Sequence, residues 1–202
     1  MLGLVSIVEG KGEKQALPIV LRRVLKEMSP PHVFDILTPI HRPRDKMLKP
    51  GELERAVDLA SRQIARRGAI LVVLDSDDDQ PCELGPRLLQ RAQNAASEIT
   101  TRVVLAHREW EAWYRAAAAS LAGRRGLLPN LTPPNNPEAG RDAKGWLTKH
   151  MTPGRAYSPT VDQPAFAAIF DLDAARQAPS FSKLCRDIRY LRDETLQKFP
   201  FQ

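Results

Sequence analysis

Residues 70–79 read ILVVLDSDDD, an apolar run that is followed directly by acidic residues, and this pattern indicates the fold class. The run 70–74 follows Gly68 and is typical of a buried strand in a parallel sheet, because such strands are apolar on both faces. Open α/β sheets bind their ligands beyond the carboxyl ends of their strands, which is where residues 75–79 fall. The stretch therefore predicts an α/β protein with a ligand site at this strand end.

The acids of this stretch, among them Asp75, Asp77 and Asp79, predict a divalent-cation site. Carboxylates packed together repel each other unless a cation neutralises them. Oxygen ligands without a nearby His or Cys favour Mg²⁺ or Mn²⁺ over zinc. The alternative is a solvated acidic loop, which is common where strands turn into helices.

A second apolar run near the N-terminus also ends in acid. Residues 2–8 read LGLVSIV and are followed by EGKGEK at residues 9–14. The two glycines of this turn permit a tight backbone path, so Glu9 and Glu13 can face one site from the strand end and the first helical turn. The turn does not complete GxGxxG, and GxxxxGK[ST] is absent from the chain, so neither a dinucleotide site nor a P-loop is expected.

A third acidic strand end follows residues 103–106, where VVLA runs into HREWEAW at residues 107–113. Glu109 and Glu111 would lie about 200° apart on a helix, so we expect only one of them to point inward. The alternative is that acids in a first helical turn simply stabilise the helix dipole. Trp110 and Trp113 are expected to be core residues rather than stacking platforms for bases.

The order of elements is that of an open α/β sheet. The predicted strands are 2–8, 32–37, 70–74 and 102–106, and the predicted helices are 13–28, 51–67, 82–97 and 109–121. A loop is expected at 38–49. Strands that alternate with helices imply an open, mostly parallel, four-stranded sheet with helices on both faces, as in Rossmann-like folds.

The composition changes after Gly123, where a long loop rich in Pro and Asn begins. We therefore expect a core at 1–123 and a C-terminal, largely helical extension at 124–202 that packs on it as a cap and ends in a helix at 181–196. That helix carries a basic stripe, which could follow a phosphate backbone; its members are Lys183, Arg186, Arg189 and Arg192. A solvated helix face explains the same pattern.

The composition limits the possible partners. The chain has 202 residues, 43% of them hydrophobic, which suits one domain with an elaboration. Its net charge of +6 and pI near 9.6 favour a polyanionic partner. Cys82 and Cys185 are its only cysteines, so a disulfide framework or a zinc quartet is not expected. No signal peptide or segment of membrane-spanning length is apparent, which predicts a cytoplasmic protein without a membrane partner. The oligomeric state stays open.

These strand ends resemble the Toprim domain, which carries a Glu-Gly after its first strand and an Asp-x-Asp after a later one. Residues 8–10 (VEG) match the first element and residues 75–77 (DSD) match the second. The variant is closest to nucleases of the overcoming-lysogenization-defect (OLD) type, which have a further glutamate where Glu13 stands. More narrowly, the chain resembles the uncharacterised DUF4276 family over most of its length. The matching stretches are VEGKGEKQALPIVLRR, VLDSDDDQPCELGP, REWEAW, AKGWL and YSPTVDQPAF.

The resemblance implies a metal-dependent phosphodiesterase, most simply a nuclease that uses Mg²⁺ or Mn²⁺. In the two-metal scheme, Glu9 and Asp75 would anchor the ions. The cluster would be completed by Glu13, Asp77 and Glu111, with Asp79 in reserve and Glu109 as the alternative to Glu111. Glu9 would instead act as general base if one ion binds. Lys144 or Lys183 would stabilise the pentavalent phosphate, and the sequence does not choose between these two lysines.

The acidic motifs have three other interpretations. A non-catalytic, Toprim-like scaffold or nucleic-acid-binding subunit is the main alternative. A phosphotransferase of the haloacid dehalogenase kind would place its Asp-x-Asp after the first strand, which is not the order found here. An EF-hand is excluded because Gln80 and Pro86 replace the required glycine and glutamate.

The resemblance also suggests partners. The expected substrate is nucleic acid, DNA rather than RNA. OLD-type proteins often join a Toprim domain to an ATPase, and this chain carries no P-loop. An ATPase acting in trans, within a phage defence system, is therefore a hypothesis that rests on the resemblance alone.

Overall fold

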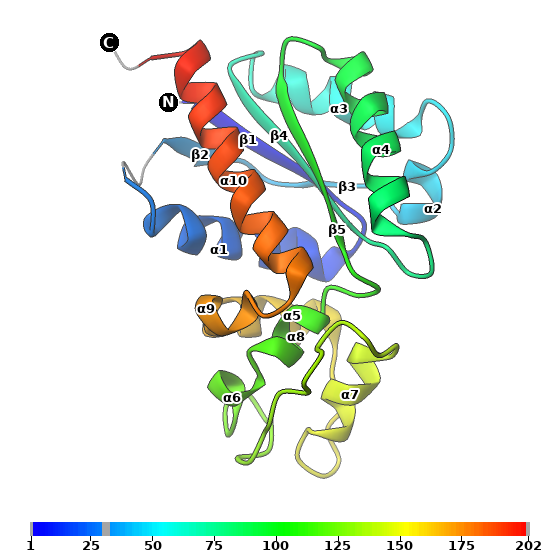
Figure 1. Cartoon of the computed structure of the whole chain (residues 1–202), viewed down its shortest axis with the longest axis vertical. Coiled ribbons are helices and arrows are strands. Elements are labelled where there is room, and N and C mark those ends of the chain that lie inside the picture. The colour runs from blue at the N-terminus through cyan, green and yellow to red at the C-terminus, as the bar shows by residue number, and fades with distance from the viewer. Residues whose placement is uncertain (1, 30–32, 201–202) are drawn as a thin grey trace.

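The computed structural model describes residues 2–29 and 33–200, which form a central sheet with helices on both faces and a small helical lobe at one end (Figure 1). The strands are β1 (Leu2–Val8), β2 (Phe34–Ile36), β3 (Ile40–His41), β4 (Gly68–Asp75) and β5 (Thr100–Ala106). The helices are α1 (Lys11–Lys26), α2 (Arg44–Met47), α3 (Glu52–Gln63), α4 (Pro81–Ala95), α5 (Ala112–Ala116), α6 (Ala118–Leu121), α7 (Ala143–Lys149), α8 (Pro159–Ala167), α9 (Leu172–Ala175) and α10 (Pro179–Lys198). None of these helices has the length and apolar character needed to cross a membrane.

The sheet is parallel throughout and has the order β2-β1-β4-β5. The prediction of an open, parallel α/β sheet is confirmed, but the predicted number of four strands is wrong. A fifth strand, β3, pairs with β1 at Ile7 and Val8, inside the stretch expected to be a loop. This position is available because β2 pairs with β1 only as far as Leu4 and leaves the end of β1 without a neighbour. The first residues of the predicted second strand, including His32, lie outside the described residues.

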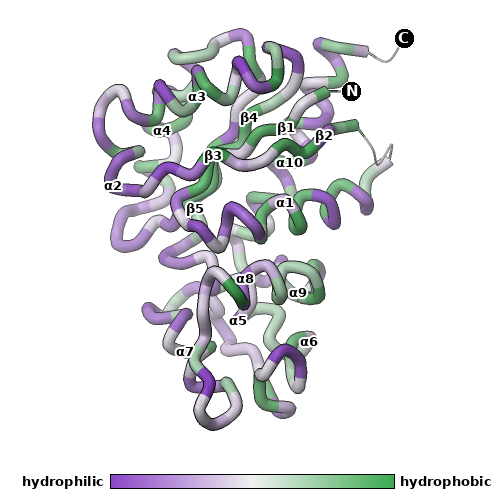
Figure 2. The backbone as a smooth tube through the Cα atoms, turned by 180° about the vertical axis from the view of Figure 1, so that it is seen from behind, coloured by the Kyte–Doolittle hydropathy of each residue, from purple (hydrophilic) through white to green (hydrophobic). Residues whose placement is uncertain are grey.

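Two apolar layers enclose the sheet, as its uniformly buried strands predict. Alternate residues of β1, β4 and β5 face opposite sides, so Leu71 and Val73 belong to one core cluster and Ile70 and Val72 to the other. Helices α1 and α10 cover the first side, and α3 and α4 cover the second (Figure 1). Figure 2 shows the hydrophobic stretches gathered along the central strands.

The structure departs furthest from the prediction in the region after β5, where the sequence predicts a helix at 109–121. Residues 107–111 form a turn, and the helix is divided into α5 and α6 at Ala117. The turn is held by tertiary contacts, since the backbone N–H of Trp110 donates to the Asp75 carboxylate and Glu109 accepts from the start of α7. Trp110 and Trp113 are fully buried, which confirms them as core residues.

The C-terminal segment contributes both to the lobe and to the sheet layers. Helices α5 to α9 form the lobe beyond the carboxyl ends of the strands, whereas α10 runs back along β5 and β4 (Figure 1). The helical C-terminus is as predicted; the division at residue 123 stays a prediction. The lobe therefore lies next to the carboxyl ends of the strands (Figure 1), where open α/β sheets bind their ligands.

Substitution of Gly68 by alanine should destabilise the protein. The backbone of Gly68 has φ of +154°, and a Cβ atom there would lie 1.9 Å from the carbonyl oxygen of Gly3 on β1. We expect Gly68→Ala to lower the free energy of unfolding by about 2 kcal/mol or more, as measured by urea denaturation. Gly85→Ala is the control, because a Cβ there meets nothing closer than 3.9 Å, and alanine should stabilise α4 by about 0.5–1 kcal/mol. Equal effects of the two substitutions would contradict this account of the β1–β4 contact.

Candidate metal centre

Three carboxylates, two at neighbouring strand ends and one on the helix that follows the first strand, meet in one cluster, which we call the acidic triad: Glu9, Glu13 and Asp75. Glu9 follows β1, Glu13 lies in the first turn of α1, and Asp75 ends β4. Because β1 and β4 are parallel neighbours, their carboxyl ends lie side by side. One oxygen from each carboxylate lies within 4.8 Å of the others. The structure thus brings together three of the sequence-predicted ligands.

Burial makes the negative charge of the acidic triad strongly unfavourable. Desolvation, followed by the charge of Glu13, raises the pKa of Glu9 to about 7. Desolvation, followed by the charge of Asp75, raises the pKa of Glu13 to about 8. The Asp75 carboxyl is buried, and its pKa is raised well above the ordinary value by desolvation and then by Glu9. Hydrogen bonds from the N–H of Trp110 to Asp75, at 2.7 Å, and from the N–H of Gly10 to Glu13, at 3.3 Å, oppose these shifts without cancelling them.

The acidic triad fits a hard divalent cation. All three donors are carboxylates, which suit Mg²⁺ or Mn²⁺ better than softer metals. The Oε2 atom of Glu9 is buried and has no hydrogen-bond partner among the described residues, so it is free to bind an ion. The cluster opens into a pocket of about 430 Å³, also lined by Lys11, Arg44 and Thr160, which gives an ion and its ligands access.

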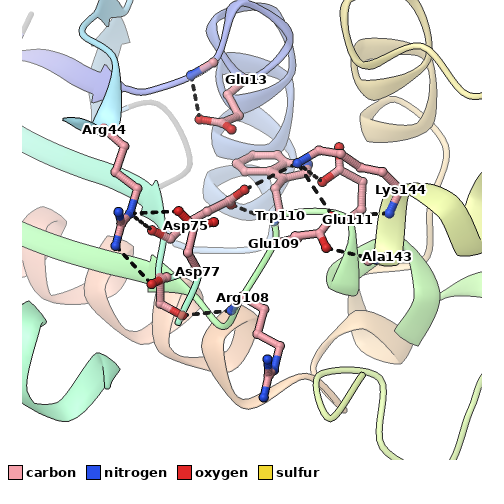
Figure 3. A network of polar contacts seen from close by, with 12 residues as sticks. Glu13, Arg44, Asp75, Asp77, Arg108, Glu109, Trp110, Glu111, Ala143 and Lys144 are labelled. Carbon is pink, nitrogen blue, oxygen red and sulfur yellow. Dashed lines mark hydrogen bonds and ion pairs between the residues drawn. The ribbon is translucent and has the colours of Figure 1, made fainter. Parts of the chain in front are cut away.

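Lys144, on α7 of the lobe, reaches into the cluster (Figure 3). Its Nζ lies 3.7 Å from Asp75, 3.6 Å from Glu109 and 3.5 Å from Glu111. Desolvation lowers the pKa of this ammonium, but the surrounding carboxylates, Glu111 first, outweigh the effect and raise it. Lys144 therefore stays charged and neutralises part of the acid around it.

Glu109 and Glu111 both point toward Lys144. The expectation that only one of them faces inward is wrong, because they lie in a turn rather than on a helix. Glu109 accepts hydrogen bonds from the backbone N–H groups of Ala143 and Lys144, at 3.1 and 3.2 Å. Glu111 is fully buried, and its Oε1 accepts from the Tyr157 hydroxyl and the Gln163 amide, both at 2.9 Å. Desolvation raises the pKa of Glu111 despite these contacts.

Asp77 and Asp79 turn away from the acidic triad toward Arg44. Asp77 has a left-handed backbone with φ of +48°, which redirects the chain immediately after β4. Its carboxylate is half exposed, at the rim of the pocket, 3.3 Å from the Arg44 guanidinium. Asp79 pairs with the same guanidinium. These two acids are thus placed outside the cluster whose oxygens converge.

Lys183 lies away from the acidic triad, beside β5. Its ammonium donates to the carbonyl of Val103, at 2.8 Å, and pairs with Asp187, so it is held against the middle of β5. The basic stripe of α10 is also divided, because Arg192 pairs with Asp193, whereas Arg186 and Arg189 line a separate pocket between α1 and α10. Of the two candidate lysines, only Lys144 is placed at the acidic triad.

Sequence reasoning did not assign a role to three residues of this region: Arg44, Tyr157 and Gln163. The last two bind Glu111 from the lobe, across 46 and 52 residues of chain. The sequence contained one signal for Tyr157 and Gln163, since both lie in YSPTVDQPAF, one of the stretches that resemble the family. A second signal was Gly12, where a Cβ would lie 2.5 Å from the backbone carbonyl oxygen of Pro159, so α8 can approach α1 only over a glycine.

The chain matches the model of a protein family. A family model described as "Domain of unknown function (DUF4276)" matches residues 8–189. No curated protein and no solved structure matches the chain. The likeness to Toprim nucleases therefore stays a prediction.

The metal-free protein should lose stability as the pH rises from about 5 to 8. Glu9 and Glu13 have folded-state pKa values above the ordinary 4.5, so the folded protein holds more protons than the unfolded chain in this range. Their contribution to the free energy of unfolding is complete below the ordinary pKa of 4.5. It is lost as the pH rises through the folded-state values of about 7 and 8. Glu13→Gln should flatten this dependence and raise the free energy of unfolding at pH 8 by on the order of 1 kcal/mol. Urea denaturation in chelator measures it, with the exposed Glu83→Gln as control. An unchanged slope in Glu13→Gln would contradict the proposed repulsion.

Mn²⁺ or Mg²⁺ should raise the melting temperature by binding only the folded protein. A hundredfold excess of ion over Kd corresponds to about 2.7 kcal/mol. Asp75→Asn should abolish this increment, whereas Asp78→Asn, which changes a largely exposed acid outside the acidic triad, should retain it. Thermal unfolding with and without metal makes the comparison. A metal-induced shift that survives in Asp75→Asn would place the ion elsewhere.

Proposed function

The chain belongs to the DUF4276 family, and we propose that this member is a divalent-metal-dependent phosphodiesterase, most simply a nuclease acting on nucleic acid. The observation that supports the proposal best is the acidic triad, in which two buried carboxylates and the half-buried Glu9 converge within 4.8 Å at the edge of a pocket. A protein that needed these residues only for stability would gain by neutralising them, because buried like charges oppose folding. Their convergence favours a catalytic cation.

Phosphodiester hydrolysis suits the groups at this pocket. A divalent ion, when bound, supplies the charge that activates an attacking water and neutralises the phosphate. Glu9, Glu13 and Asp75 would hold the ion, and the N–H of Trp110 keeps the Asp75 carboxylate in place. In the reaction, the attacking water would release a proton to solvent as its oxygen bonds to phosphorus, the bond from phosphorus to the leaving sugar oxygen would break, and that oxygen would take up a proton from solvent.

Positive side chains at the pocket would bind the substrate. Lys11, Arg44 and Lys144 line it, and the whole chain carries a net charge of +6. Cationic side chains next to a carboxylate cluster suit a phosphate group that must approach a negatively charged site. We propose DNA rather than RNA as substrate and an ATPase in trans as partner, both on the resemblance to OLD-type nucleases.

A non-catalytic scaffold is the second candidate, and the contacts of Lys144 are the observation that favours it. This ammonium already pairs with Asp75, Glu109 and Glu111, so part of the cluster is neutralised by the chain itself. In that case the basic surface would bind a partner or nucleic acid without cleavage.

Cleavage assays should separate the two candidates. Wild-type protein is incubated with plasmid, single-stranded DNA and RNA, each with Mg²⁺, Mn²⁺ or chelator. We expect metal-dependent cleavage that falls at least about 100-fold in Glu9→Gln and Asp75→Asn, the size of effect seen when transition-state stabilisation is removed. Binding of nucleic acid, followed by fluorescence anisotropy, should be retained or improved because a repelling charge is gone. Asp78→Asn is the matched control and should cleave normally. Absence of cleavage with both metals, even beside an ATPase partner, would favour the scaffold.

A further inference from the structure

We propose that the Lys144 ammonium occupies the position of a second cation, so that the centre binds a single divalent ion at the acidic triad. The inference rests on the metal site of the proposed function and adds how many ions that site takes. It assigns Glu109 and Glu111 to the lysine rather than to a metal.

The ammonium is centred among its partners. Its distances of 3.7, 3.6 and 3.5 Å to Asp75, Glu109 and Glu111 differ by only 0.2 Å. All three exceed the usual 2.7–3.2 Å of a hydrogen bond. The nitrogen is therefore held by the combined field of three carboxylates rather than by one directed contact. We call these three carboxylates, Asp75, Glu109 and Glu111, the cage.

Each carboxylate of the cage is held in place by hydrogen bonds that do not involve the Lys144 Nζ (Figure 3). Glu109 is held by two backbone N–H groups at the start of α7, and Asp75 by the N–H of Trp110. Glu111 is held through Oε1 by Tyr157 and Gln163, which leaves its buried Oε2 facing Lys144 without a hydrogen bond. Removal of the ammonium would thus leave three fixed carboxylates without their cation.

The cage adjoins the acidic triad through Asp75, which belongs to both. Centres with two metals hold their ions about 3.5–4 Å apart, so a carboxylate can serve both positions. Here one of the two positions is the acidic triad and the other contains the ammonium. A divalent ion among the cage carboxylates would lie within a few ångströms of Nζ, where two cations repel strongly.

The spacing of the oxygens agrees with this division. The triad oxygens all lie within 4.8 Å of one another, as direct coordination of one ion requires. The cage oxygens lie 3.5–3.7 Å from the Lys144 Nζ, which therefore fills the space where a second ion would otherwise bind.

Counting bound Mn²⁺ by electron paramagnetic resonance, without nucleic acid, tests the inference. The wild-type protein should bind one ion per chain. Lys144→Met, which keeps the length of the side chain and removes its charge, should bind two. Lys144→Met combined with Glu109→Gln should return to one, because the cage then loses a ligand. Lys11→Met, which removes another lysine that lines the same pocket, is the matched control and should bind one.

Each count has a definite meaning. Two ions in the wild type, or one in a folded Lys144→Met, would overturn the inference and leave the proposed function standing. Two ions in the double variant would place the additional ion outside the cage and also overturn it. No bound ion in the wild type would overturn the inference and the proposed metal-dependent function together. The wild-type count is decisive by itself if Lys144→Met does not fold.

Discussion

The parallel pairing of β1 with β4 is the contact on which the rest of the site depends. It places Glu9 beside Asp75 at one sheet edge and lets α1 add Glu13 from its first turn. Apolar residues cover both faces of these strands, so the pairing cannot slip without moving side chains from one layer to the other. A rigid, hydrophobic sheet thus forces together carboxylates that repel each other.

That repulsion is balanced by contacts from distant parts of the chain. Backbone N–H groups bind Asp75 and Glu13, Lys144 enters from the lobe, and Tyr157 and Gln163 fix Glu111. Buried charges require such compensation, since desolvation otherwise costs several kcal/mol per ion. Side chains of the lobe therefore offset part of the negative charge at the carboxyl ends of the strands, and the site is formed by both parts of the molecule.

Sequence reasoning succeeded where a residue's role follows from its place next to a strand. The acidic triad could be predicted because Glu9 and Asp75 directly follow apolar runs and Glu13 lies one helical turn further on. The alternation of strands and helices likewise predicted a parallel α/β sheet. It failed where the local pattern depended on distant partners, as at residues 109–121, where contacts with Asp75 and α7 hold a turn in place of a helix. The short β3 was missed because only the free end of β1 makes it a strand.

The local hydrophobic pattern sufficed to predict the main strands β1, β4 and β5 and the acids that follow them, because each of these features lies within one short stretch of the chain. The tertiary structure placed Lys144 rather than Lys183 at the acidic triad, turned Asp77 and Asp79 toward Arg44, and directed both Glu109 and Glu111 at one ammonium. Those choices depend on how α7, α8 and α10 return to the sheet from more than 30 residues away. Periodicity carries no information on such returns, since the packing of the whole chain sets their direction.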